Sequence, residues 1–189
     1  MTRIKGITKK DAGLLIKAVY WFARREFGAV PEPVTVTAHH PKLLLASGRH
    51  ELAVKKAVKS SAHGPLFELC VYRTAVKLGC SWCVDFGAML MKHEGLDIER
   101  LKHIDSYATS ALFTDLERKA LAYADAMTDT PVSVTDEQVA ELEKLLGRKE
   151  LVALTYEIAL ENQRARFNSA FAILDQGFTS GDACRVPAN

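Results

Sequence analysis

Two cysteines, Cys80 and Cys83, lie three positions apart in the stretch GCSWCVDFG. Gly79 is typical of the residue that ends a helix, and the residues after it predict a new helix that begins at Cys80–Ser81. A thiol at a helix N-terminus faces unpaired backbone N–H groups and the positive end of the helix dipole, which stabilise a thiolate. C-x-x-C thiols in this setting can have strongly depressed pKa values. The pair therefore indicates redox chemistry, with one activated thiol and one that closes a disulfide.

Such chemistry needs a group that handles protons, and Glu68 is the first candidate. It lies twelve residues before Cys80, in a helix predicted over 65–78 that is otherwise apolar nearly all the way round. Burial would raise the pKa of this carboxyl toward the range useful for a general base. A structural role stays open beside this one, as an ion pair with Arg73 or a hydrogen bond to Tyr72.

Asp85 is a second candidate for proton handling, because it follows Cys83 by two residues on the next predicted helix. A purely structural role is the simpler interpretation of this carboxylate. Trp82, between the two cysteines, would either shield the thiols from water or pack in the core.

The remaining cysteines and the histidines do not have the spacing of a metal site. There is no second C-x-x-C pair and no H-x3-5-H pair, so the sequence predicts no zinc and no other cofactor. Cys70 reads as a small core residue, and Cys184 as an inert thiol or one that exchanges with the pair. The histidines considered are scattered along the chain: His39, His40, His63, His93 and His103.

The elements that must hold this pair are helices. Capping boxes at Thr114–Glu117 and Thr135–Gln138 mark two helix starts. Apolar residues recur with helical spacing through most of the chain, which predicts an all-α bundle of about seven helices. The ranges are 10–27, 41–60 with an interruption near Ser47–Gly48, 65–78, 80–95, a short helix at 97–104, 115–128, 136–146 and 148–175.

Length and composition fit one domain over 1–189, because 189 residues with 48% hydrophobic side chains can bury a sizeable core. We expect an N-terminal helix and linker arm over 1–40, a core over 41–130 and C-terminal helices with a tail over 131–189. Residues 34–37 of the linker have the composition of a short strand, although nothing nearby offers it a partner.

Charge and hydropathy limit the classes of partner. The formal net charge is only +2 and no dense Lys/Arg block occurs, so nucleic-acid binding is not expected. No apolar run is long enough for a signal peptide or a membrane span. We therefore expect a soluble cytoplasmic protein, and in that reducing compartment a C-x-x-C pair is more often catalytic or metal-binding than structural.

Glu68, eleven residues, and then Cys80-Ser-Trp-Cys83 in an all-α chain resembles the carboxymuconolactone decarboxylase/alkyl hydroperoxidase D-like superfamily. The resemblance covers roughly residues 40–130 and extends to the long last helix. It implies a helical fold built around a two-helix core, usually assembled as a homo-oligomer. It also implies a thiol-dependent peroxidase in which Cys83 attacks a peroxide, Cys80 resolves the sulfenic acid, Glu68 is the base, and a dithiol or protein restores the thiols.

The sequence departs from that pattern at two histidine positions. Trp82 stands directly before the second cysteine, and Gly87 stands four residues after it. His93 would lie about 15 Å along a continuous helix from Cys83, too far to replace them. The relay from Glu68 thus lacks an imidazole. The helix dipole also favours Cys80 as the thiolate, whereas the resemblance assigns attack to Cys83.

Two other functions stay open. One is a lactone decarboxylase or related lyase on the same fold, which would need no C-x-x-C pair. The other is a redox-sensing or structural homo-oligomer that retains the pair without turnover. On the last helix, charged residues between Tyr156 and Arg166 are most simply explained as surface pairs or an oligomer contact.

Overall fold

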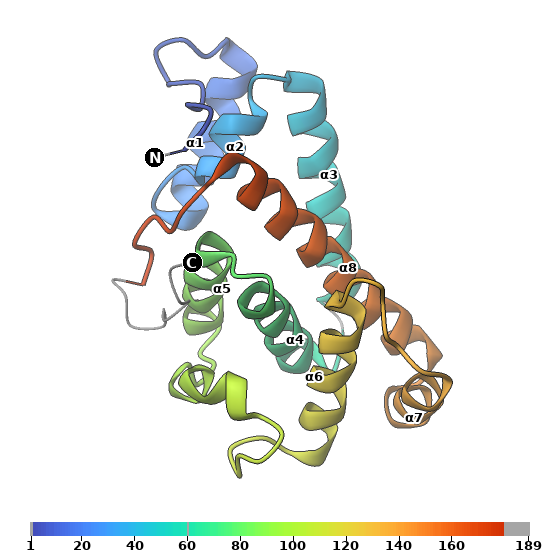
Figure 1. Cartoon of the computed structure of the whole chain (residues 1–189). Coiled ribbons are helices and arrows are strands. Elements are labelled where there is room, and N and C mark those ends of the chain that lie inside the picture. The colour runs from blue at the N-terminus through green and yellow to red at the C-terminus, as the bar shows by residue number, and fades with distance from the viewer. Residues whose placement is uncertain (1, 60, 180–189) are drawn as a thin grey trace.

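The chain is built from helices in all the parts that the computed structural model describes, residues 2–59 and 61–179 (Figure 1). The prediction of an all-α protein is confirmed, and this part of the chain contains no strand. The elements in order are α1 Leu14–Phe27, α2 Glu32–Thr37, α3 Pro41–Val58, α4 Gly64–Lys77, α5 Ser81–His93, the 3-10 helix η1 Glu99–Ser106, α6 Asp115–Thr128, α7 Asp136–Leu146 and α8 Arg148–Phe171.

The helix α4 occupies the middle of the main core. It packs against α5, α6 and α8, and no residue between Leu66 and Val76 is exposed. Phe67, Leu69 and Cys70 are almost fully buried there. A helix that is apolar nearly all round gains most when it is covered on every side, which explains its central place.

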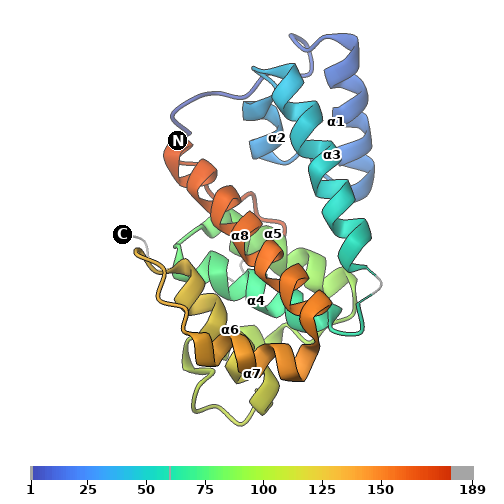
Figure 2. The same ribbon diagram turned by 90° about the vertical axis from the view of Figure 1, so that its right-hand side faces the viewer.

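The helix α8 crosses the molecule and connects its two parts (Figure 2). It packs against α3 on one side and against α4, α5, α6 and α7 on the other. Its buried positions recur every three or four residues along one face and include Leu154, Ile158, Glu161, Ala165 and Asn168. The side chain of Asn168 is therefore carried into the core beside α5.

The N-terminal helices have a small core of their own. Ile16 and Tyr20 of α1 pack with Ala38 and Leu44, and the Tyr20 hydroxyl donates a hydrogen bond to the carbonyl of Ile7 at 2.8 Å. Figure 2 shows α1, α2 and α3 as a group beside the larger bundle.

Two local predictions in this region were wrong. Residues 34–37, expected to suit a strand, form the end of the helix α2. No strand is present among the described residues to pair with them, and Pro33 stands in the first turn, where a helix tolerates proline. The expected interruption near Ser47–Gly48 is also absent, because α3 runs through it from Pro41 to Val58. An isolated glycine costs only about 1 kcal/mol in a helix.

The predicted capping boxes are confirmed. The Thr114 and Thr135 hydroxyls accept from the backbone N–H groups of Glu117 and Gln138, at 3.3 Å in each case. The Glu117 and Gln138 side chains accept in return from the backbone N–H of the capping residue. These boxes fix the starts of α6 and α7.

Among residues 2–59 and 61–179, no helix has the length and apolar character needed to cross a membrane.

Candidate redox site

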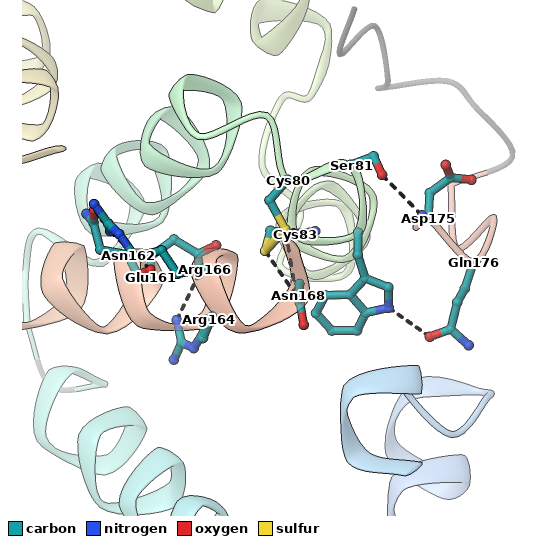
Figure 3. Close-up of a disulfide and its surroundings, with 11 residues drawn as sticks. Cys80, Ser81, Cys83, Glu161, Asn162, Arg164, Arg166, Asn168, Asp175 and Gln176 are labelled. Carbon is teal, nitrogen blue, oxygen red and sulfur yellow. Dashed lines mark hydrogen bonds and ion pairs between the residues drawn. A yellow bond between two sulfur atoms is a disulfide. The ribbon is translucent and has the colours of Figure 1, made fainter. Parts of the chain in front are cut away.

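Cys80 and Cys83 form a disulfide at the start of α5 (Figure 3). Their Cα atoms are 5.3 Å apart. Cys80 is the N-cap residue, and its sulfur accepts a hydrogen bond from the backbone N–H of Cys83 at 3.3 Å. The predicted helix start is therefore confirmed, with the pair on the first turn. Both residues are buried, with 3% of Cys80 and 7% of Cys83 exposed.

A tight corner between α4 and α5 puts the pair in this position. Gly79 has a φ of 65°, in the left-handed region that favours glycine. The backbone N–H of Cys80 then donates to the carbonyl of Ala75 at 3.0 Å. The last turn of α4 thus holds the first cysteine, and α5 returns along α4.

Asn168 of α8 brings a polar side chain to the disulfide. Its Nδ2 lies 3.4 Å from the sulfur of Cys83 and 3.6 Å from that of Cys80 (Figure 3). Disulfide sulfurs only accept hydrogen bonds, so the NH2 end of the amide faces them. Sequence reasoning missed this residue because 85 positions separate it from Cys83. Its place in the buried helical spacing of α8 was the one available signal.

Aromatic rings cover the side of the disulfide formed by α5. Trp82 stacks on Phe86 with ring centroids 4.7 Å apart, and Phe178 meets Phe86 edge to face at 5.3 Å. Phe27 of α1 packs on the other edge of Phe86 at 5.1 Å. Trp82 is only 7% exposed, so it packs in the core, one of the two roles expected of it.

Gln176 ties three segments together beside this cluster. Its Oε1 accepts from Trp82 Nε1 at 2.8 Å and from the backbone N–H of Glu32 at 2.7 Å. Its Nε2 donates to the carbonyl of Val30 at 3.3 Å. The N-terminal linker, α5 and the segment after α8 therefore meet next to the disulfide.

Asp85 is buried and binds the segment that follows α8. Its carboxylate accepts from the backbone N–H groups of Gln176, Phe178 and Thr179 at 3.2, 2.9 and 2.9 Å, and from the Thr179 hydroxyl at 2.8 Å. All four bonds hold residues 176–179 against α5. This is the structural role that the sequence left open beside proton handling.

Glu68 lies on α4 and is half-buried. It precedes Ala75, which contacts Cys80, by seven residues, a rise of about 10 Å along the helix. The ion pair with Arg73 that the sequence left open does not form. Arg73 instead binds Asp125 at 2.7 Å and Asp105 at 2.6 Å.

The surroundings of Glu68 raise its pKa to about 7. Burial is the main cause, the negative charges of Glu94 and Glu157 add to it, and the positive charges of Arg164 and Lys55 oppose it. A carboxyl with this pKa exchanges its proton near neutral pH, as a general acid or base requires. The role of Glu68 as a base for the cysteine pair stays a prediction.

Glu157 and Glu161 of α8 are buried and so do not form surface pairs, whereas Arg166 is exposed and donates to Asn162 Oδ1 one turn away, as expected of a surface pair. Glu157 and Glu161 are 9% and 4% exposed. Arg164 lies between Glu51 of α3 and Glu161, with its Nη1 3.2 Å from Glu161 Oε2 (Figure 3). Burial also raises the pKa of Glu161 to about 7, against the lowering effect of Arg164.

At the position four residues after Cys83, Gly87 leaves room for a ring from α4. A Cβ atom on Gly87 would lie 3.7 Å from Cδ2 of Tyr72. Tyr72 is 3% exposed and thus fills the space beside this part of α5. Cys70 is fully buried, and burial raises the pKa of its thiol, so it stays protonated. Cys184 lies outside the described residues.

Comparison with solved structures identifies the architecture. An alkylhydroperoxidase AhpD core protein from Ralstonia eutropha JMP134, described as peroxidase-related, superposes with a TM-score of 0.76 at 16% identity, over 94% of each chain. This chain has the alkylhydroperoxidase D-like fold. The resemblance drawn from Glu68, Cys80 and Cys83 is confirmed at the level of the fold.

Two other proteins match this chain along nearly its whole length. A cysteine-to-alanine variant of the debrominase Bmp8 in complex with 2,3,4-tribromopyrrole has a TM-score of 0.81 at 17% identity, over 95% of each chain. The uncharacterized protein YnjA of Escherichia coli K12 is 29% identical over 181 residues, which is 92% of each sequence. No family model matches the sequence.

The candidate site contains the cysteine pair but no imidazole at the two positions where the resemblance expects one. Trp82 belongs to the aromatic cluster, and Gly87 is covered by Tyr72. Among residues 2–59 and 61–179 no group of three or more His, Cys, Asp or Glu could hold a metal ion. The contacts within this site therefore join two sulfurs and the amide of Asn168.

The raised pKa of Glu68 makes stability depend on pH. The unfolded chain loses this proton near the ordinary pKa of 4.5, while the folded chain keeps it until about pH 7. The folded state therefore binds more protons in this window, and stability falls as pH rises from about 5 to 8. We expect Glu68→Gln to make the decrease in the free energy of unfolding over this pH range smaller by roughly 2 kcal/mol. Urea unfolding at several pH values measures it.

Glu26→Gln, at an exposed carboxylate of α1, is the matched control and should leave the pH dependence unchanged. An unaltered slope in Glu68→Gln would contradict the assigned burial of a protonated Glu68.

The hydrogen bonds of Asp85 predict what holds residues 176–179 in place. Asp85→Asn should lower the free energy of unfolding by about 2–4 kcal/mol, because a buried set of charge-assisted bonds is disrupted. It should also speed the alkylation of the reduced thiols, since this segment lies against the aromatic cluster beside them. Asp175→Asn, at an exposed carboxylate of the same segment, should change neither quantity.

Proposed function

We propose that the protein is a thiol-dependent peroxidase that reduces hydroperoxides through a Cys80–Cys83 dithiol/disulfide cycle. The observation that carries this proposal is the pair at the first turn of α5, with Asn168 donating to both sulfurs. Helix N-terminal N–H groups and a side-chain donor both favour a thiolate. The alkylhydroperoxidase D-like fold supports the same reaction class.

The cycle is balanced in three steps. The thiolate of Cys83 attacks the terminal oxygen of a hydroperoxide, the O–O bond breaks, and the alkoxide takes a proton to leave as an alcohol. The thiol of Cys80 attacks the resulting sulfenic acid, which forms the disulfide and releases water. A dithiol or protein reductant then exchanges with the disulfide and restores both thiols.

Attack by Cys83 agrees with its slightly greater exposure, 7% against 3% for Cys80. Cys80 is the more enclosed residue, and its sulfur already accepts the backbone N–H of Cys83. This arrangement suits a resolving thiol that need not meet the substrate. The helix dipole alone would favour a thiolate on Cys80, the residue nearer the helix terminus, so the assignment of attack to Cys83 rests on the resemblance and on exposure.

The proton balance of the cycle falls to Glu68 and solvent. With a pKa of about 7, Glu68 is partly protonated at neutral pH and can accept or return a proton. Within this proposal Asp85 holds the C-terminal segment, and proton transfer through it would be secondary.

We also propose that the protein is a cytoplasmic homo-oligomer. Large apolar side chains on α1 are exposed, among them Leu14, Trp21 and Phe22 at 87%, 64% and 51%. Apolar side chains gathered on one helix support a contact with a second copy.

The cysteine variants test the peroxidase directly. Cys83→Ser should abolish the consumption of hydroperoxide with a dithiol reductant, because the attacking sulfur is gone. Cys80→Ser should permit one oxidation of Cys83 and then stall, which mass spectrometry would detect as a sulfenic acid. Cys70→Ala should retain turnover, since Cys70 is fully buried in α4.

Three outcomes of this test would favour another attacking thiol or another function. Turnover retained in Cys83→Ser would overturn the assignment of the attacking thiol. Lyase activity on a lactone that survives in a Cys80→Ser/Cys83→Ser variant would favour a decarboxylase. Rapid oxidation of the pair without turnover would favour a redox sensor.

A second candidate is the reductive debromination of a small aromatic ring. It is favoured by the match to the debrominase Bmp8 over 95% of each chain and by the rings of Trp82, Phe86 and Phe178 beside the disulfide. The same dithiol supplies the electrons: an aryl bromide and two thiols give the arene, bromide, a proton and the disulfide.

Incubation of the reduced protein with 2,3,4-tribromopyrrole tests this candidate. Debromination predicts one bromide ion released for each disulfide formed, measured by ion chromatography and thiol titration. The wild-type rate should exceed that of Cys83→Ser by at least about a hundredfold, since a catalytic nucleophile is removed. Bromide release below the level of free dithiothreitol would exclude this substrate.

A further inference from the structure

The amide of Asn168 is buried and only half satisfied. The residue is 1% exposed, and its Nδ2 faces the sulfurs of Cys83 and Cys80. Its Oδ1 is buried without a hydrogen-bond partner among the described residues. Buried polar atoms are nearly always paired in native proteins, so an unpaired acceptor beside a reactive group requires an explanation.

Packing alone does not explain this amide. Asn168 occupies a core position on α8, in spacing with Leu154, Ile158 and Ala165. An apolar side chain would fill such a position without leaving a carbonyl oxygen unpaired. The bonds to the sulfurs are also long, at 3.4 and 3.6 Å, as expected for the weak acceptors of a neutral disulfide.

The hydrogen bond from Asn168 Nδ2 to a sulfur becomes stronger when the disulfide is reduced and that sulfur is ionised. A hydrogen bond to an ionised acceptor is roughly twice as strong as one between neutral groups. The two N–H groups of Nδ2 therefore favour a thiolate over both the thiol and the disulfide. They do so at every pH, because an amide does not titrate, whereas an imidazole loses one donor when it loses its proton.

We propose that Asn168 is a catalytic residue whose Nδ2 stabilises the thiolate of Cys83 and whose free Oδ1 accepts the O–H of the hydroperoxide. This inference rests on the proposed peroxidase function and assigns the substrate contact at the same site. The amide takes over the donor role of the absent imidazole. It cannot take over the role of base.

The two ends of one amide bring the reactants together. A hydroperoxide that donates its proton to Oδ1 presents its terminal oxygen next to the sulfur held by Nδ2. The sulfur lone pair attacks that oxygen, the O–O bond breaks, and the electron pair leaves on the alkoxide, which is protonated by water. The product is a sulfenic acid on Cys83 and an alcohol. Binding thus orients the O–O bond toward the nucleophile.

The thiol pKa is the direct readout of this role. It is measured from the pH dependence of iodoacetamide alkylation in a Cys80→Ser background, where Cys83 is the reactive thiol. Asn168→Ala should raise the pKa of Cys83 by about one unit or more, since one lost charge-assisted bond has that size. Asn168→Asp, of the same shape, should raise it further by placing a carboxylate against the thiolate.

The other charged groups around the pair stay in place in every variant, so the shift reports Asn168. They are Glu68 on α4, Asp85 on α5, Glu161 and Arg164 on α8, and Asp175 in the segment after it. Asn162 is the matched control. It is an asparagine of the same helix, and its Nδ2 donates to Thr128 at 3.2 Å, away from the sulfurs.

In the variants that retain both cysteines, hydroperoxide consumption at pH 7 should fall at least about tenfold for Asn168→Ala and Asn168→Asp. The fall should persist at a pH where Cys83 is fully ionised, because the substrate contact through Oδ1 is also lost. Asn162→Ala should match the wild type in both assays. Circular dichroism and thermal unfolding establish that each variant is folded.

The outcomes separate this inference from the proposed function. A folded Asn168→Ala and a folded Asn168→Asp with the wild-type thiol pKa would overturn the thiolate role. A full recovery of turnover at high pH would overturn the contact with the hydroperoxide. A wild-type protein without peroxidase turnover would remove the proposed function and the substrate contact, while the thiol pKa would still decide whether Asn168 stabilises the thiolate.

Discussion

The helix α4 contacts α5, α6 and α8 at once because its apolar side chains leave almost no face for water. This burial sets the geometry of the redox site. The corner at Gly79 must return α5 along α4, which fixes the first turn of α5 at the C-terminal end of α4. Covering the same helix with α8 then carries Asn168 to that turn. The disulfide and its amide donor meet as a consequence of one packing requirement.

The same packing places charges where water is scarce. Glu68, Glu157 and Glu161 are drawn into the contact between α4 and α8, and Arg164 compensates them only in part. The desolvation of these carboxylates is the largest cause of their raised pKa values. Burial of ionisable groups beside a reaction centre costs stability, and it also tunes proton exchange to neutral pH.

The segment after α8 closes the site from the other side. Asp85 binds its backbone, Gln176 ties it to Trp82 and to the N-terminal linker, and Phe178 completes the aromatic cluster. These contacts join residues near both ends of the described chain over the first turn of α5. They help to explain why Cys80 and Cys83 are nearly fully buried in the disulfide form.

Local sequence determined the helices, the capping boxes at Thr114 and Thr135, and the placement of Cys80 at a helix start, because these depend on periodicity and on hydrogen bonds within a few residues. It misjudged residues 34–37 and the burial of Glu157 and Glu161, because the conformation of the first and the burial of the other two are set by distant neighbours. Only the tertiary structure decided that Asn168 reaches the sulfurs and that Asp85 binds the C-terminal segment. Those contacts join residues more than 80 positions apart, and no local pattern encodes which helix faces will meet.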